Sequence, residues 1–232
     1  MKKLLLLAGI VGVSLASAQA DTLALWTFEL SQPASGGAQA TLDSISPETG
    51  SGTASAAHAS SSTVYTSPAG NGSVHSFSSS FWGIGDYYQF QVNSSGFQDL
   101  TVSYDQTGSG TGPKSFHLSY STDGSSFTDF GSSYSVLLNG APNGAWSSGT
   151  ARNAAYTFSA DLSSIAALDD SPAVYFRLIN DSNVSINNGT VATAGTDRVD
   201  NFLVSATPVP EPSSLFLMGG LGILAVRFLR RR

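Results

Sequence analysis

Apolar and polar side chains alternate strictly along three segments in the middle of the chain, 86–93, 99–106 and 115–122. A period of two is typical of β-strands that have one buried and one solvated face. The apolar members are Tyr88, Phe90, Val92, Leu100, Val102, Tyr104, Phe116, Leu118 and Tyr120. We predict that these residues form the core, and that Gln89, Asp105 and His117 lie on the solvated faces.

Turn signals and further apolar runs extend this pattern. Asp123-Gly124 accepts positive φ angles and predicts a hairpin to a strand through Phe127. Further strands are predicted at 23–29, 134–138, 155–161, 174–180 and 197–206, with 174–180 central because it is apolar on both parities. The only predicted helix, at 161–168, would be capped by Asp161.

The segment 31–62 has hardly any large apolar residues and is rich in Ser, Ala, Gly and Thr. This composition predicts a long loop. Eight or nine short strands with almost no helix predict an all-β fold, an antiparallel β-sandwich of the jelly-roll type. Residues 21–207 are enough for one such domain.

The first twenty residues are typical of a secretory signal peptide. Lys2 and Lys3 precede an apolar run, and the small residues Ala18 and Ala20 follow it. We predict a signal peptide at 1–20, with cleavage after Ala20.

The last 25 residues contain three ordered features. Pro210, Glu211 and Pro212 come first, an apolar run from Leu215 follows, and the end is rich in arginine. A helix over 215–229 would be about 22 Å long, short of a bilayer core of about 30 Å. We predict a short transmembrane helix with a cytoplasmic C-terminus, because basic residues concentrate on that side. The flanking arginines are Arg227, Arg230, Arg231 and Arg232.

This tail, 208–232, resembles the PEP-CTERM sorting signal of Gram-negative envelope proteins, with Pro210, Glu211 and Pro212 in the place of the name motif. The resemblance implies processing by an exosortase, after anchoring in the inner membrane, and delivery to the cell surface or extracellular matrix. The alternative is an ordinary single-pass anchor. The segments 111–127, 174–178 and 195–204 also resemble the jelly-roll ectodomains that recur in such proteins.

The charge of the predicted ectodomain narrows its partners. Residues 21–207 hold four basic and fifteen acidic residues, a formal charge of −11. Such a surface repels nucleic acid and attracts divalent cations. The chain has no cysteine, which excludes disulfides, thiolate catalysis and cysteine-based zinc sites.

No hydrolase motif is present. The chain has neither G-x-S-x-G nor H-E-x-x-H, and no motif surrounds His58, His75 or His117. We therefore predict that the protein is not an enzyme. A pair of acids placed together by the fold, as in a glycosidase, stays open.

Two groups of residues are candidate binding sites. Glu29, Asp197 and Asp200 offer the oxygen ligands that calcium prefers, if the first and last strands are neighbours. The alternative is that Asp200 pairs with Arg177 or Arg198. Trp82 and Trp146, in turn-like surroundings, could stack on sugar rings if exposed, although both could equally belong to the core.

Two functions follow from these observations. The first is a structural or adhesive module of the extracellular matrix, sorted by an exosortase after signal peptidase has acted. The alternative is a carbohydrate-binding module for exopolysaccharide. Nucleic acid is not an expected partner.

Overall fold

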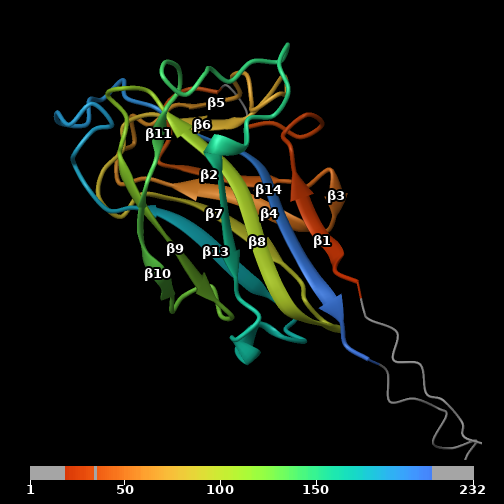
Figure 1. Ribbon diagram of the computed structural model, residues 1–232. Helices are drawn as coiled ribbons and strands as arrows, with labels where there is room; N and C mark the ends of the chain where they lie inside the picture. The colour runs from red at the N-terminus through yellow and green to blue at the C-terminus, as the bar shows by residue number, and fades with distance from the viewer. Residues whose placement is uncertain (1–18, 34–35, 211–232) are drawn as a thin grey trace, which may run out of the picture.

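The computed structural model describes residues 19–33 and 36–210. Within them the chain forms two β-sheets that pack face to face (Figure 1). The first sheet has the order β11-β8-β14-β1-β3, with β12 beside β8, β6 beside β14, and β5 beside β6. Its strands are β1 (Asp21–Trp26), β3 (Thr49–Gly50), β5 (Tyr65–Thr66), β6 (Phe77–Ser79), β8 (Phe97–Gly108), β11 (Leu137–Leu138), β12 (Thr157–Asp161) and β14 (Asp197–Pro208).

The second sheet has the order β10-β9-β13-β7-β4-β2. Its strands are β2 (Thr41–Ile45), β4 (Gly52–Ala57), β7 (Tyr87–Val92), β9 (Ser115–Ser121), β10 (Thr128–Ser135) and β13 (Val174–Asn180). Every pair in this sheet is antiparallel. In the first sheet, β11 pairs with β8 in parallel. Apart from this one pair, the predicted all-β fold with two antiparallel sheets is confirmed.

The predicted core faces are confirmed. Eight of the nine alternating apolar residues are buried, and Tyr120 is partly buried against the same cluster. Phe90 of β7 stacks on Phe202 of β14 with ring centroids 3.5 Å apart, and Trp26 of β1 meets Phe90 edge-on at 5.3 Å. These rings join the two sheets.

The prediction of a loop over 31–62 is wrong, because this segment contributes β2, β3 and β4. Ala54 and Ala56 are the buried residues of β4, and the ring of Trp26 lies against Gly52 at its start. A Cβ atom at Gly52 would come 2.9 Å from Cη2 of Trp26. The packing at Gly52 therefore favours a small residue. Because β4 contains only small residues, its sequence shows no alternation of large apolar and polar side chains from which a strand could be predicted.

The predicted hairpin is confirmed. Gly124 has a φ of 72° between β9 and β10. Asp123 Oδ1 accepts hydrogen bonds from the amides of Ser125 and Ser126, both at 2.7 Å. These bonds hold the pKa of Asp123 well below its usual range.

The predicted helix at 161–168 is reduced to a 3₁₀ turn, Ala166–Leu168. Asp161 does not cap it; its carboxylate accepts a hydrogen bond from the Ser163 amide at 3.0 Å. A second 3₁₀ turn, Ala154–Tyr156, precedes β12, where a strand start was predicted.

Among the described residues no helix is long and apolar enough to cross a membrane.

The first and last strands are neighbours, which is the condition that the calcium hypothesis requires. Asp21 pairs with Ala206, and Trp26 with Phe202. Both ends of the chain therefore leave the sandwich at the same end (Figure 1). Most of the predicted signal peptide, and residues 211–232 of the predicted tail, lie outside the described residues.

Candidate functional site

The outer face of the six-stranded sheet carries ordered rows of polar and aromatic side chains, which range from the buried Ser119 and Ser121 to the exposed Thr53. Across β9, β13, β7 and β4, one register row holds Ser119, Arg177, Gln89 and Ser55. The next row holds Ser121, Tyr175, Gln91 and Thr53. The residues that alternate with them along the same strands point inward and form the core. This packing holds the strands, and therefore the outward side chains, in place.

Arg177 is the centre of this face. Its guanidinium carbon lies 3.8 Å from the ring centroid of Tyr87 and 3.6 Å from that of Phe127. Its Nε donates to Gln89 Oε1 at 2.8 Å. Burial lowers the pKa of Arg177 from its usual value, and the two rings supply the cation–π contacts that offset this loss of solvation.

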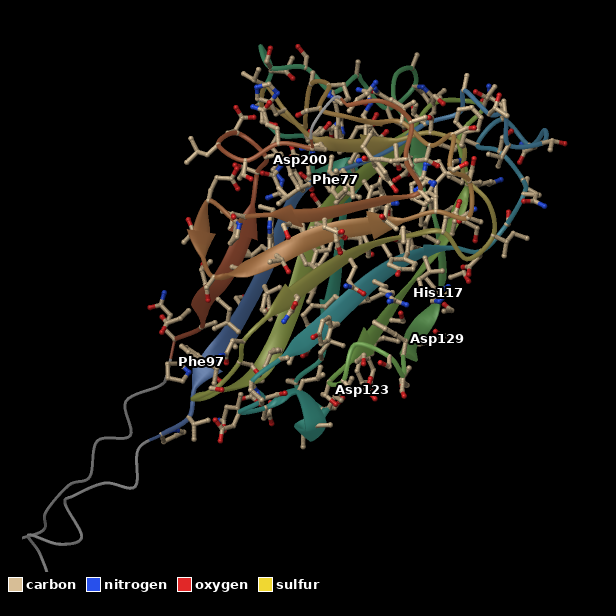
Figure 2. All side chains as sticks on the ribbon, turned by 180° about the vertical axis from the view of Figure 1, so that it is seen from behind. Phe77, Phe97, His117, Asp123, Asp129 and Asp200 are labelled. Atoms are coloured by element: carbon tan, nitrogen blue, oxygen red, sulfur yellow. The ribbon has the colours of Figure 1, made fainter. Side chains whose placement is uncertain are left out.

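His117 lies beside two carboxylates at one edge of the same face. Its Nε2 is 3.1 Å from Asp129 Oδ1, and its Nδ1 contacts Asp181 Oδ1. Figure 2 shows His117 and Asp129 close together on β9 and β10, far from Asp200. His117 is thus on the solvated side, as predicted.

A shallow pocket of about 260 Å³ opens beside this face, where β4 begins and β7 ends. Thr53, Gln91, Asn93 and Pro172 are among its lining residues. Amide and hydroxyl groups here could hydrogen-bond a polar ligand.

The two candidate tryptophans are buried, which agrees with the alternative that both belong to the core. Trp82 is 6% exposed, lies against His58, Tyr88 and Phe116, and donates from Nε1 to Ser79 O at 3.0 Å. Trp146 is 5% exposed and meets Tyr156 edge-on. Neither ring face is open to a sugar, because each is used in packing.

Two of the three candidate calcium ligands, Glu29 and Asp200, are linked only indirectly through the 73–75 segment, because Ser73 Oγ contacts both Asp200 Oδ2 and the carbonyl oxygen of His75. Glu29 Oε1 accepts from the His75 amide at 2.7 Å, and Asp197 Oδ1 accepts from Gln106 Nε2 at 2.9 Å. Among residues 19–33 and 36–210, no group of three or more acidic, histidine or cysteine side chains could hold a metal ion. Calcium binding at Glu29, Asp197 and Asp200 stays a prediction.

Asp200 belongs to a buried polar cluster at the end of the sandwich where β8 and β14 meet the 70–75 loop. Its carboxylate accepts from the Asn71 amide at 2.8 Å, from Ser73 Oγ at 2.7 Å and from the Asn201 amide at 2.7 Å. Burial raises the pKa of Asp200 to about 6, although these hydrogen bonds oppose the rise. The expected pairing of Asp200 with Arg177 or Arg198 is wrong.

The arginine in this cluster, Arg152, forms an ion pair with Asp105 and not with Asp200. Arg152 Nε and Nη2 each lie 2.7 Å from a carboxylate oxygen of Asp105, and Asn71 and Asn201 also donate to it. The bidentate pair raises the pKa of Arg152. The prediction that Asp105 lies on a solvated face is wrong, because the 70–75 and 152–157 segments cover that end of β8.

Asp86, His58 and Ser79 lie in the order of a hydrolytic triad. His58 Nδ1 is 3.3 Å from Asp86 Oδ2, and Ser79 Oγ is 3.3 Å from His58 Nε2. The three side chains are buried, Trp82 packs on His58, and Ser79 Oγ lies 3.1 Å from the Tyr88 hydroxyl. Burial lowers the pKa of His58. In this conformation Ser79 is 1% exposed, so its hydroxyl is closed to a substrate.

Sequence reasoning missed Arg152, Asn71 and the triad-like contacts. Arg152 carries one usable signal, since it is one of only four basic residues among fifteen acidic ones in 21–207, so an acidic partner could be expected for it. Asn71 and Ser79 lie in segments of common polar residues, where the sequence distinguishes none of them.

Comparison with known proteins identifies the C-terminal segment. Residues 208–232 match the PEP-CTERM protein-sorting motif. No curated protein matches the chain.

Among solved structures, two β-rich domains are similar at low identity. The CBM22-1 xylan-binding domain of Xyn10C from Paenibacillus barcinonensis is 10% identical, with a TM-score of 0.44, over 84% of this chain and 100% of that one. The K3 cleaved adhesin domain of Lys-gingipain from Porphyromonas gingivalis is 15% identical, with a TM-score of 0.41, over 79% and 98%.

Proposed function

We propose that this chain is an exported envelope protein whose β-sandwich acts as a structural or adhesive module of the cell surface or extracellular matrix. Signal peptidase would cleave after Ala20, the tail would anchor the protein in the inner membrane, and an exosortase would then process it. The observation that carries the proposal is the PEP-CTERM motif at 208–232, which begins where the sandwich ends.

The sandwich supports this role. It would begin at Asp21, the first residue after the predicted cleavage site, and that residue is already paired in β1. Both addressing segments would thus be removed without disturbing a strand. The buried Asp86–His58–Ser79 contacts support a module that is not an enzyme.

Replacing Pro210, Glu211 and Pro212 by alanine tests the sorting step. We expect the wild-type protein to reach the cell surface or medium, and the triple variant to stay in the inner-membrane fraction. Cell fractionation with immunoblotting measures both. Equal surface delivery of both proteins would contradict exosortase sorting through this motif.

A second function, carbohydrate binding to exopolysaccharide, is favoured by the outer face of the six-stranded sheet. Tyr175 and the amide side chains of Gln89 and Gln91 form ordered rows there, beside the pocket at Thr53. A sandwich of the jelly-roll type would present such a face as one platform. Sugars are bound by combinations of aromatic surface and planar hydrogen-bonding groups.

A glycan array with the purified chain tests this second function. We expect saturable binding that Gln91→Ala and Tyr175→Ala weaken. Gln98→Ala is the matched control, because Gln98 is also half-buried on a strand but lies in the other sheet. Absence of saturable binding, or equal loss in all three variants, would contradict a sugar site on this face.

A further inference from the structure

The sorting motif is joined to the folded sandwich without a spacer. The motif begins at residue 208, and Pro208 is the last residue of β14, paired with Phe97 of β8. The amide of Val209 donates to Gly96 O at 2.9 Å. Pro210, the first residue of the Pro-Glu-Pro triplet, therefore follows directly after a residue whose backbone is bound to the domain.

A side chain strengthens this attachment. Thr207 Oγ1 is 3.1 Å from the carbonyl oxygen of Gln98 and 2.9 Å from Oδ2 of Asp99, so its single hydroxyl proton is placed to serve either acceptor. Two further carboxylates hold the β8 side in place, since Asp169 accepts from the Asp99 amide at 3.1 Å and Asp170 from the Gly96 amide at 2.8 Å. The receiving strand is thus braced by side chains from a separate loop.

The attachment is one-sided. β1 begins at Asp21, which pairs with Ala206, so among residues 19–33 and 36–210 β14 has no partner on that side after Ala206. Successive backbone amides point to opposite sides of a strand. Because the Val209 amide points to β8, the Pro208 nitrogen points to the side on which β1 has ended, and proline has no amide hydrogen to donate. Thr207–Val209 is therefore held by β8 alone. In Figure 2, Phe97 lies at the end where the chain leaves the sandwich.

Such a segment can open locally without unfolding the domain, because strand ends held by few bonds open at low free energy. If a peptide bond is accessible to a protease only in the open form, and opening and closing are faster than cleavage, the rate of cleavage is proportional to the population of the open form. We propose that Thr207–Val209 is a tether that limits exosortase access, so that release of this strand end from β8 sets the rate of tail processing. This inference rests on the proposed exosortase processing.

Thr207→Val tests the tether, because it keeps the shape of the side chain and removes the hydroxyl. Loss of one such hydrogen bond should increase opening, and therefore the rate of processing, about two- to tenfold. The matched control is Thr101→Val on the same strand pair, which removes the contact of 2.8 Å to Ser205 Oγ away from the strand end. It should leave the rate at the wild-type value. Pulse-chase in the native host, read from the size of the protein, gives the rates.

Insertion of a flexible Gly-Ser spacer of about six residues between Val209 and Pro210 separates the motif from the tether. We expect this variant to be processed faster than wild type, and Thr207→Val to have no further effect within it. Hydrogen exchange of the Val209 amide, measured on unprocessed full-length protein in detergent, should be faster in Thr207→Val than in Thr101→Val.

The outcomes separate the two proposals. A wild-type protein that is never shortened would contradict exosortase processing itself. If the wild type is shortened but the spacer and Thr207→Val leave its rate unchanged, or if Val209 exchange is unaffected, the tether does not limit processing and this inference fails alone.

Discussion

Phe90 shows how single side chains join the two sheets. It is fully buried, stacks on Phe202 and lies edge-on to Trp26, so it touches strands of both layers. Its neighbours on β7, Gln89 and Gln91, point to the other face and are half-buried. Adjacent positions on one strand therefore contribute very differently to stability.

Phe90→Ala should lower the free energy of unfolding by about 3–5 kcal/mol, because it removes a buried ring and leaves a cavity. Phe116→Ala, also fully buried, should cost a similar amount. Gln91→Ala is the control and should change stability by less than about 0.5 kcal/mol. Chemical denaturation of the three variants measures this, and equal losses would show that the face assignment is wrong.

Asp197 is a buried acid with an incomplete set of partners. It is fully buried, and its Oδ2 has no hydrogen-bond partner among the described residues. Burial raises the pKa of Asp197 well above its usual value. Because the folded-state pKa exceeds the unfolded-state one, the carboxyl stabilises the fold while protonated, and this contribution is lost as pH rises through the folded-state pKa.

Asp197→Asn should therefore gain in melting temperature relative to wild type as pH rises from about 4. The amide keeps an oxygen for Gln106 and cannot ionise. Melting curves at several pH values measure the difference. Asp43→Asn is the control and should follow wild type, because Asp43 is exposed. A difference for Asp197→Asn that does not change with pH would mean that Asp197 ionises freely in the fold.

At the scale of elements, the strands with large alternating residues were predictable and those with small residues were not. The faces of β7, β8 and β9 follow directly from their sequence period, and the Asp123-Gly124 hairpin follows from turn chemistry. β4 carries only Gly, Thr, Ala and Ser, because its space is taken by Trp26, and no local pattern records a neighbour that lies far away in the chain.

The candidate face shows the same division. The period of β7 places Gln89 and Gln91 outside, as predicted from the sequence. The stacking of Arg177 between Tyr87 and Phe127 depends on the order of β9, β13 and β7 in the sheet, which only the tertiary fold defines. Asp105 was misplaced for a related reason, since loops from distant segments bury a strand end that would otherwise be solvated.

Gly52→Ala tests the explanation of β4. A Cβ atom there would come 2.3 Å from the Gln91 carbonyl oxygen as well as 2.9 Å from Trp26, so we expect a loss of about 1–3 kcal/mol from overpacking. Gly37→Ala is the control, because a Cβ atom at Gly37 meets nothing within 4 Å. Thermal unfolding compares the two, and equal melting temperatures would contradict the tight packing of β4 on Trp26.

At the scale of the whole molecule, the sandwich lies in the sequence between the predicted signal peptide and the PEP-CTERM motif. β1 starts at Asp21 and β14 ends at Pro208, next to the sorting motif. Pairing of the first and last strands places both segments on the same side, so the rest of the domain is free to face outward. The acidic charge of −11 over 21–207 suits a soluble, self-repelling module.

The most direct test of this account is the intact mass of the protein released from the surface of the native host. We predict a chain that begins at Asp21 and ends near residues 210–212, because signal peptidase and an exosortase would remove the two addressing segments. Recovery of a surface protein that still ends at Arg232 would contradict exosortase processing and would make the tail an ordinary membrane anchor.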